Sequence, residues 1–136
     1  MSEMRPPLSA TLEWDGELQF TGQVGKHEIG MDGAADAAPT PVQLLALSLA
    51  GCMAIDLVQI LTRGRHAVTS LTVAFTGHRS AEAPMRFTAI RLEFALSGEM
   101  LPEHVDRAIQ LSRDKYCSVW HTFRPDIELQ TGYTIA

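Results

Sequence analysis

The feature that most constrains the fold is a nearly continuous apolar run in the middle of the chain, Leu44 to Ile55. Thr40 and Pro41 precede it, and a hydroxyl residue followed by proline is typical of the first turn of a helix. Arg63 and Gly64 follow it, and a basic residue followed by glycine is typical of a helix end. These residues predict one long helix from Pro41 to about Arg63.

The length of this run argues for a buried helix rather than a membrane span. Its 12 residues fall short of the roughly 18 that a bilayer requires. The helix is apolar on nearly every side, so one sheet packed on one side would leave much of it exposed. We therefore expect a second subunit to cover the remainder, which predicts a homodimer that does not enter a membrane.

The remainder of the chain alternates short strands with one further helix. Asp15-Gly16 favours a tight hairpin turn in the opening segment, and Pro102 opens a segment with apolar residues at helical spacing. The order of strands, long helix, strands, helix and strand, without a repeat or a long linker, predicts an α+β fold with a single domain over residues 1–136. The expected elements are a hairpin around 15–16, a strand at 26–32, an antiparallel strand pair at 67–78 and 87–96, a helix from 102 to about 115–117, and a strand at 126–135.

Composition excludes several classes of function. A net charge of −5 without a basic block is not typical of a nucleic-acid-binding protein. The first ten residues contain no apolar stretch of signal-peptide length, so we expect a cytoplasmic protein. The five histidines and two cysteines form no C-x-x-C or H-x-x-x-H pair, so we expect no metal cofactor. Neither a G-x-S-x-G elbow nor a phosphate-binding glycine loop is present.

The polar residues of the long helix form a stripe that contains one of the two cysteines. Ser48, Cys52, Asp56, Gln59 and Arg63 are spaced four, four, three and four residues apart, so they lie on one face. The stripe fits a solvent-exposed or subunit-facing surface on which Cys52 is only a small hydrophobic residue. It also fits a reactive thiol, although a carboxylate one turn away, Asp56, would disfavour a thiolate there.

The other cysteine, Cys117, lies in the segment D-K-Y-C-S-V-W-H at the expected end of the second helix. Lys115 favours a thiolate, whereas a helix C-terminus disfavours it. Cys52 and Cys117 are 65 positions apart, and a disulfide requires their Cα atoms within about 7 Å. Nothing in the periodicity shows that the two cysteines meet.

Three segments together resemble the OsmC/Ohr family, the osmotically inducible protein C and organic hydroperoxide resistance proteins. They are H-E-I-G-M-D, A-P-T-P-V-Q-L-L-A-L-S-L-A-G-C-M-A-I-D and L-S-R-D-K-Y-C-S-V. The similarity spans nearly the whole chain and is strongest to the OsmC-like branch that carries K-Y-C-S-V.

The resemblance implies an OsmC-like fold, with the long central helix and the second helix packed on antiparallel sheets in an intertwined homodimer. It implies that Cys52 matches the peroxidatic cysteine and Cys117 the resolving cysteine. The activity would be reduction of a small apolar organic hydroperoxide, followed by a Cys52–Cys117 disulfide and its reduction by an external dithiol. No metal, flavin or haem cofactor is implied.

The sequence departs from the hydroperoxidase pattern at two places. Those enzymes have a glutamate directly after the proline that starts the central helix, where this chain has Val42. They also have an arginine in the N-terminal strands, where this chain offers only Lys26 and His27; Arg86 is a further source of positive charge. The sequence therefore supports a thiol-dependent peroxidase, with a non-catalytic or redox-sensing dimer that binds a small ligand as the alternative.

Overall fold

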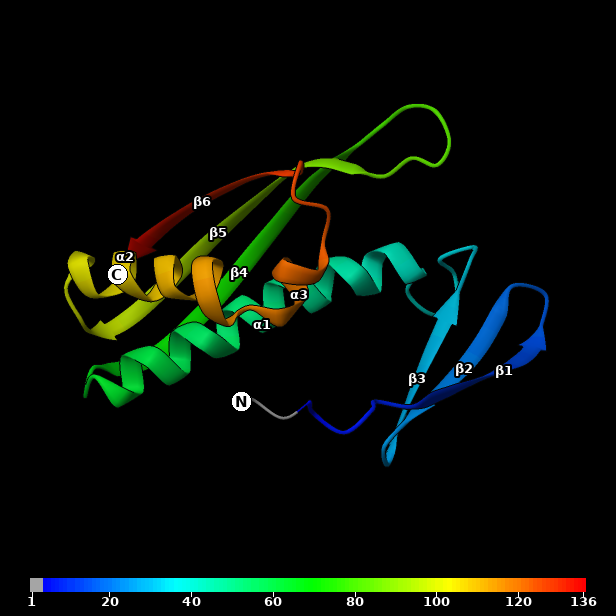
Figure 1. The fold of residues 1–136 in the computed structure, drawn as a ribbon, viewed down its shortest axis with the longest axis horizontal. Coiled ribbons are helices and arrows are strands. Elements are labelled where there is room, and N and C mark those ends of the chain that lie inside the picture. Colours follow the sequence, from blue (N-terminus) through cyan, green and yellow to red (C-terminus); the bar gives the residue numbers. More distant parts are fainter. Residues whose placement is uncertain (1–3) are drawn as a thin grey trace. The chain divides into compact units, whose positions relative to one another are not determined.

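The structure is a computed structural model, and it describes residues 4–136. The chain divides into two compact units, one ending at Leu45 and the other comprising Ala46–Ala136 (Figure 1). Each unit has its own three-stranded sheet. The α+β class is confirmed, and the single domain over residues 1–136 stays a prediction.

The first unit is an antiparallel sheet in the order β1-β2-β3, formed by β1 (Ala10–Gly16), β2 (Gln19–Val24) and β3 (His27–Asp32). The predicted hairpin is present, but its turn lies later than the sequence suggested. Gly16 pairs with Gln19, and positive φ angles occur at Gly16 (109°) and Glu17 (49°). An irregularity between Trp14 and Gly16 shifts the register, so Asp15 belongs to the strand rather than the turn.

Asp32 organises the loop that leads from β3 to the long helix. Its side chain is buried, and its carboxylate accepts backbone hydrogen bonds from Ala34 (2.9 Å), Asp36 (3.3 Å) and Ala37 (2.9 Å). The N–H groups of Ala37 and Ala34 lower the pKa of Asp32, outweighing the opposite effect of burial. The acidic end of the H-E-I-G-M-D segment thus has a structural role.

The long helix, α1 (Pro41–Arg63), begins as predicted. The Thr40 hydroxyl accepts a hydrogen bond from the Gln43 N–H (3.1 Å), and the Gln43 side chain accepts one from the Thr40 N–H (2.9 Å). This is a reciprocal cap that satisfies two N–H groups at the helix start. Gln43, one position beyond Val42, is therefore a capping residue.

The long helix α1 ends at Arg63 as predicted, but its left-handed residue lies one position later than expected. Arg65, rather than Gly64, has the left-handed conformation (φ 64°). The His66 N–H donates to the Leu61 carbonyl and the Arg65 N–H to the Thr62 carbonyl, the pattern that closes a helix with its left-handed residue at position 65. The stop is in the predicted place, but a non-glycine residue provides it.

The second unit packs helices on a mixed sheet in the order β4-β5-β6, with β4 (Ala67–Arg79), β5 (Phe87–Glu99) and β6 (Glu128–Ile135). β4 and β5 pair antiparallel as predicted, and β6 joins β5 in parallel. Figure 1 shows α1 and α2 (Pro102–Leu111) along this sheet. Their shared core includes Leu49, Met53, Leu57, Leu61, Ile90, Leu92, Phe94, Leu96, Val105, Ala108 and Ile109.

The segment after α2 is more structured than the sequence suggested. A five-residue π-helical segment, η1 (Ser112–Tyr116), continues the helix, and a separate short helix, α3 (Ser118–Thr122), follows. Cys117 lies between them. It is therefore at the start of a helix as well as at the end of one.

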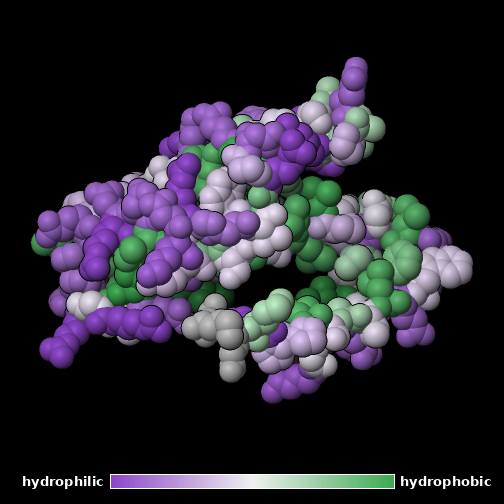
Figure 2. All heavy atoms as spheres, in the orientation of Figure 1, coloured by the Kyte–Doolittle hydropathy of each residue, from purple (hydrophilic) through white to green (hydrophobic). Residues whose placement is uncertain are grey.

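The side of α1 away from the core remains apolar and open. Leu47 is 64% exposed and Ile55 61% exposed, and Figure 2 shows hydrophobic residues at the surface of the chain. Ile55 also lines a shallow, mostly apolar hollow of about 350 Å³ with Val58 and Leu71. The observed helix spans 23 residues and is long and apolar enough, by length and composition, to cross a membrane. The 12-residue apolar run used in the sequence argument covers only part of this length. Core helices pass the same test, and absence from membranes stays a prediction.

Candidate functional site

The structure brings together two cysteines and one carboxylate within the second unit. Cys52 and Asp56 lie one turn apart on α1, and Cys117 lies at the junction of η1 and α3. The two Sγ atoms and a carboxylate oxygen of Asp56 all lie within 4.8 Å of one another. Both cysteines are present as free thiols.

Ser112, the first residue of η1, holds this arrangement in place. Its hydroxyl donates a 2.7 Å hydrogen bond to Oδ2 of Asp56, and its carbonyl accepts a 2.8 Å hydrogen bond from the Cys117 N–H. The Ser112 side chain is fully buried. One residue therefore fixes both the carboxylate on α1 and the backbone of the second cysteine.

Cys117 is strongly shielded from solvent. Its exposed fraction is 0%. Burial raises its pKa to about 12, and the Cys52 thiol and the negative charge of Asp56 act in the same direction. The Trp120 N–H, which donates to Sγ at 3.3 Å, acts to lower that pKa. The sequence predicted opposing effects from Lys115 and a helix C-terminus, whereas burial and an N-terminal N–H dominate here.

Cys52 has a different setting, because it is only half-buried. The polar stripe predicted around it divides into two parts. Cys52 and Asp56 face the η1–α3 junction, while Ser48, Gln59 and Arg63 are exposed. The predicted stripe therefore contributes two residues to the cysteine cluster, and its other three residues face solvent.

The chemistry available to this cluster follows from its three groups. Two adjacent thiols can exchange with a disulfide or accept oxygen from a peroxide. Two sulfurs and a carboxylate are also three groups that could hold a metal ion. Spacing alone had argued against a metal, and the absence of a metal cofactor stays a prediction.

Arg86, one of the basic residues considered as partners of a thiolate, has other contacts. Arg86 lies 3.6 Å from the Asp126 carboxylate and donates to the Phe87 carbonyl at 3.1 Å. His27 is the first residue of β3, in the first unit. Arg86 thus takes part in a surface ion pair, and the structure gives it no contact with the cysteines.

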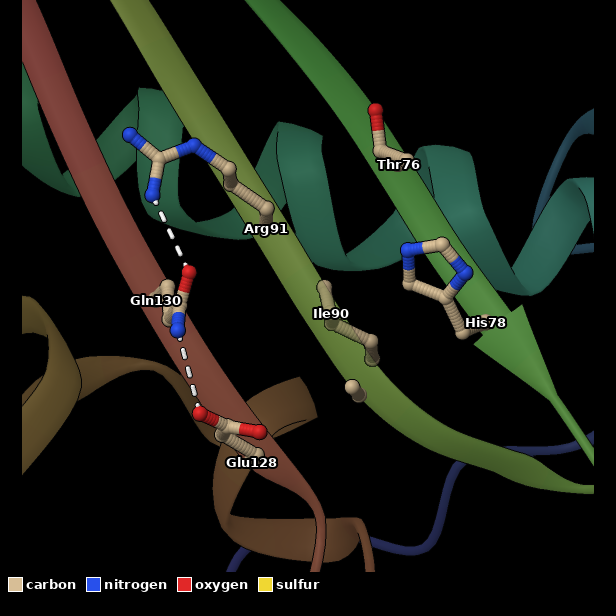
Figure 3. Close-up of a pocket in the computed structure, with 7 residues that line it drawn as sticks. Thr76, His78, Ile90, Arg91, Glu128 and Gln130 are labelled. Carbon is tan, nitrogen blue, oxygen red and sulfur yellow. Dashed lines mark hydrogen bonds between the residues drawn. The ribbon is translucent and has the colours of Figure 1, made fainter.

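A second, polar hollow of about 290 Å³ lies on the sheet of the second unit (Figure 3). Its charged and amide groups bind one another: Arg91 donates to Gln130 at 3.2 Å, and Gln130 donates to Glu128 at 3.0 Å. Thr76 and His78 complete its polar lining. The cysteines are not among the residues that line this hollow.

The second unit is an α+β fold whose central helix places the half-buried Cys52 beside the buried Cys117. Residues 33–132 match the family model described as OsmC-like protein. The chain belongs to this family, as the sequence resemblance implied.

Several relatives and solved structures are similar over nearly their full length. Protein YhfA of Escherichia coli K12 is 37% identical over 131 residues, covering 94% of this chain and 98% of the relative. The structure of a hypothetical protein from Aquifex aeolicus VF5 has a TM-score of 0.90 at 23% identity, and the match covers 97% of this chain and 98% of that protein. The structure of an organic hydroperoxide resistance protein OsmC from Legionella pneumophila has a TM-score of 0.72 at 12% identity, and the match covers 97% of this chain and 99% of that protein. Both structures show a fold similar to that of this chain, and the Legionella pneumophila protein is an OsmC protein.

Sequence reasoning missed Ser112 and the part that Asp56 plays. The sequence places Asp56 in the polar stripe, one turn from Cys52, where it disfavours a thiolate, but it does not link Asp56 to Cys117 or indicate a role for Ser112. The available signal was the four-residue spacing of Cys52 and Asp56 together with the five-residue spacing of Ser112 and Cys117. Only the fold shows that these two pairs face each other.

Proposed function

We propose that the chain is a two-cysteine, thiol-dependent peroxidase that reduces organic hydroperoxides in defence against oxidative stress. The observation that carries this proposal is the proximity of the two sulfurs, which lie within 4.8 Å although 65 positions separate the residues. Cys52 is the peroxidatic residue because it is partly accessible, and Cys117 is the resolving residue because it is buried beside it.

The reaction begins with attack of the Cys52 sulfur on the terminal oxygen of the hydroperoxide. An S–O bond forms and the O–O bond breaks, so Cys52 becomes a sulfenic acid and the substrate leaves as an alcohol. The Cys117 thiol then condenses with the sulfenic acid, releasing water and forming a disulfide. An external dithiol, of the lipoyl type, reduces this disulfide and is itself oxidised.

The surface next to Cys52 supports an apolar substrate. Ile55 lies three residues after Cys52 and is exposed, beside the apolar hollow that it lines with Val58. Alkyl groups gain free energy by covering such a surface, which hydrogen peroxide cannot do. Small organic hydroperoxides are therefore the proposed substrates.

The same apolar surface supports the proposed homodimer. Large hydrophobic residues on one side of α1 are exposed in the single chain, and a second copy would remove them from water. We propose that the protein acts in the cytoplasm, where an external thiol reductant is at hand. Neither a metal nor an organic cofactor is part of the proposed reaction.

A second candidate is a non-catalytic or redox-sensing dimer that binds a small ligand. It is favoured by one observation, that Val42 stands where the hydroperoxidases of the family have a glutamate. Such a protein would bind an apolar ligand with an affinity that survives substitution of both cysteines.

The test is consumption of cumene hydroperoxide by the reduced protein with dihydrolipoamide as reductant, compared with hydrogen peroxide. A peroxidase consumes cumene hydroperoxide faster, and the Cys52→Ser variant does not consume it above the background rate. An intact hydroperoxide in the presence of the wild-type protein, together with unchanged binding of an apolar fluorescent probe to both cysteine variants, would instead support the ligand-binding dimer.

A further inference from the structure

The buried position of Cys117 creates a problem that two thiols alone do not solve. A resolving cysteine attacks as a thiolate or loses its proton during attack. The Cys117 sulfur has no exposed surface, so bulk water has no direct access to its proton. Burial also holds its pKa at about 12, which leaves almost no thiolate at neutral pH.

A carboxylate is positioned to solve this problem. The Asp56 oxygen lies within 4.8 Å of both sulfurs. The titratable groups that act on the Cys117 thiol are Cys52 and Asp56, both on α1. Of these, only Asp56 can accept a proton while Cys52 carries the sulfenic oxygen.

The orientation of Asp56 is fixed rather than incidental. The Ser112 hydroxyl donates to its Oδ2 at 2.7 Å, and a carboxylate that accepts one such bond retains further lone pairs for a second donor. Distances between a base and its proton are often longer in unliganded enzymes than in the reacting complex. Because the Asp56 oxygen and the Cys117 sulfur already lie within 4.8 Å of each other, a movement of about 1 Å is enough to bring them to the distance of a hydrogen bond to sulfur.

We propose that Asp56 is the general base and acid of disulfide formation, an inference that rests on the peroxidase function proposed above. The Asp56 carboxylate takes the proton from the Cys117 thiol as that sulfur attacks Cys52. The S–S bond forms, the S–O bond of the sulfenic acid breaks, and the departing hydroxide takes the proton from Asp56 as water. Asp56 ends the step ionised, as it began.

A purely electrostatic role for Asp56 makes the opposite prediction. A fixed negative charge disfavours a thiolate beside it, so removing the charge without removing a base would speed the attack by Cys117. The sign of the effect of Asp56→Asn therefore distinguishes the two roles. Asparagine keeps the shape and can still accept from Ser112, but it cannot accept the thiol proton.

The experiment follows a single oxidation by rapid-quench mass spectrometry. Reduced wild-type protein, Asp56→Asn and the control Asp114→Asn are mixed with excess cumene hydroperoxide, and the sulfenic acid and disulfide forms are measured over time. Asp114→Asn removes the same charge from η1, where Asp114 binds Gln110 outside the cluster. We expect wild-type and Asp114→Asn to form the disulfide alike, and Asp56→Asn to accumulate sulfenic acid and form it about 10²-fold more slowly.

The pH dependence of disulfide formation distinguishes the loss of a base from a structural defect in the variant. In Asp56→Asn the slow step should recover as pH rises, because hydroxide then deprotonates Cys117. A second measurement uses wild-type protein alone, with dimedone present to trap the sulfenic acid. The fraction that forms the disulfide rather than the dimedone adduct should stay constant from pH 6.5 to 8.5. This measurement does not depend on how well the variant folds.

Two results would overturn the assignment of Asp56. One is disulfide formation in Asp56→Asn as fast as in the wild-type protein, or faster; the other is a wild-type disulfide share that rises steeply with pH. Failure of the proposed function has a different signature, since wild-type protein would then show neither sulfenic acid nor disulfide.

Discussion

The two cysteine-bearing regions of the second unit have contrasting surroundings. Cys52 lies in the middle of α1, half-buried and next to exposed apolar side chains, whereas Cys117 lies at the η1–α3 junction with no exposed surface. The same side chain is thus available to a substrate in one place and protected from solvent in the other. The contrast teaches that environment, rather than residue type, assigns the two steps of the proposed reaction.

The largest expected effect, and the one that tests the different roles of the two cysteines, is on peroxide turnover. Cys52→Ser removes the nucleophile, so we expect consumption of cumene hydroperoxide to fall by about 10³-fold or more. Cys117→Ser should lose repeated turnover but complete the first oxidation, leaving a sulfenic acid that dimedone labels. Loss of the first oxidation in Cys117→Ser alone would reverse the assignment of the two cysteines.

The second prediction sharpens the contrast through alkylation of the reduced protein. With a pKa of about 12, Cys117 has a thiolate fraction on the order of 10⁻⁴ at pH 8, and its sulfur is shielded as well. Iodoacetamide should therefore modify Cys52 alone in the native protein and both cysteines in guanidinium chloride, as peptide mass mapping would show. Equal labelling in the native state would show that the junction opens readily.

The third prediction concerns the apolar surface beside Cys52. Ile55→Glu places a charge in the surface that we propose a second copy covers, so the protein should become monomeric at concentrations where the wild-type protein is a dimer. Arg107→Glu, at an exposed position on α2 rather than on the apolar side of α1, is the control and should leave the association unchanged. Analytical ultracentrifugation measures both, and an Ile55→Glu dimer of wild-type affinity would place the interface elsewhere.

The smallest effect is on stability at alkaline pH. The pKa of Cys117 is raised by folding, so its contribution to stability is complete below the pKa of the unfolded thiol, about 8.5. It is lost as pH rises toward the folded pKa of about 12. The free energy of unfolding should fall by up to about 1.4 kcal/mol per pH unit in this range.

Denaturant titrations of wild-type protein and Cys117→Ala at pH 8, 9 and 10 isolate this effect, because the variant lacks the titrating thiol. The difference in unfolding free energy between the two proteins should narrow as pH rises. A constant difference would mean that Cys117 titrates normally in the folded protein.

Patterns among neighbouring residues predict most of the helices and strands. The features that they do not predict depend on contacts between residues distant in sequence. The cap at Thr40, the alternation along β5 and the extent of α1 follow from neighbouring residues, so the sequence was sufficient. The hairpin turn lies at Glu17 and Leu18, two residues later than predicted. The left-handed residue after α1 is Arg65 rather than Gly64, because non-glycine residues adopt positive φ at both places. The parallel pairing of β6 with β5 depends on the whole fold.

The site shows the same division. Spacing identified Cys52 and Asp56 as neighbours on one helix, and the family resemblance implied Cys117. The burial of Cys117 and its link to Asp56 through Ser112 required the π-helical segment η1, which turns Ser112 and Cys117 toward α1. No periodicity in the sequence predicts such a segment.

The most direct test of the redox pair is the mass and thiol content of the reduced protein after one equivalent of cumene hydroperoxide. We predict the loss of two hydrogens and of both thiols, with a Cys52–Cys117 linkage in the peptide map and no such change in Cys52→Ser. Two intact thiols beside unconsumed hydroperoxide would contradict it, and would leave Cys52 as a packing or ligand-contact residue.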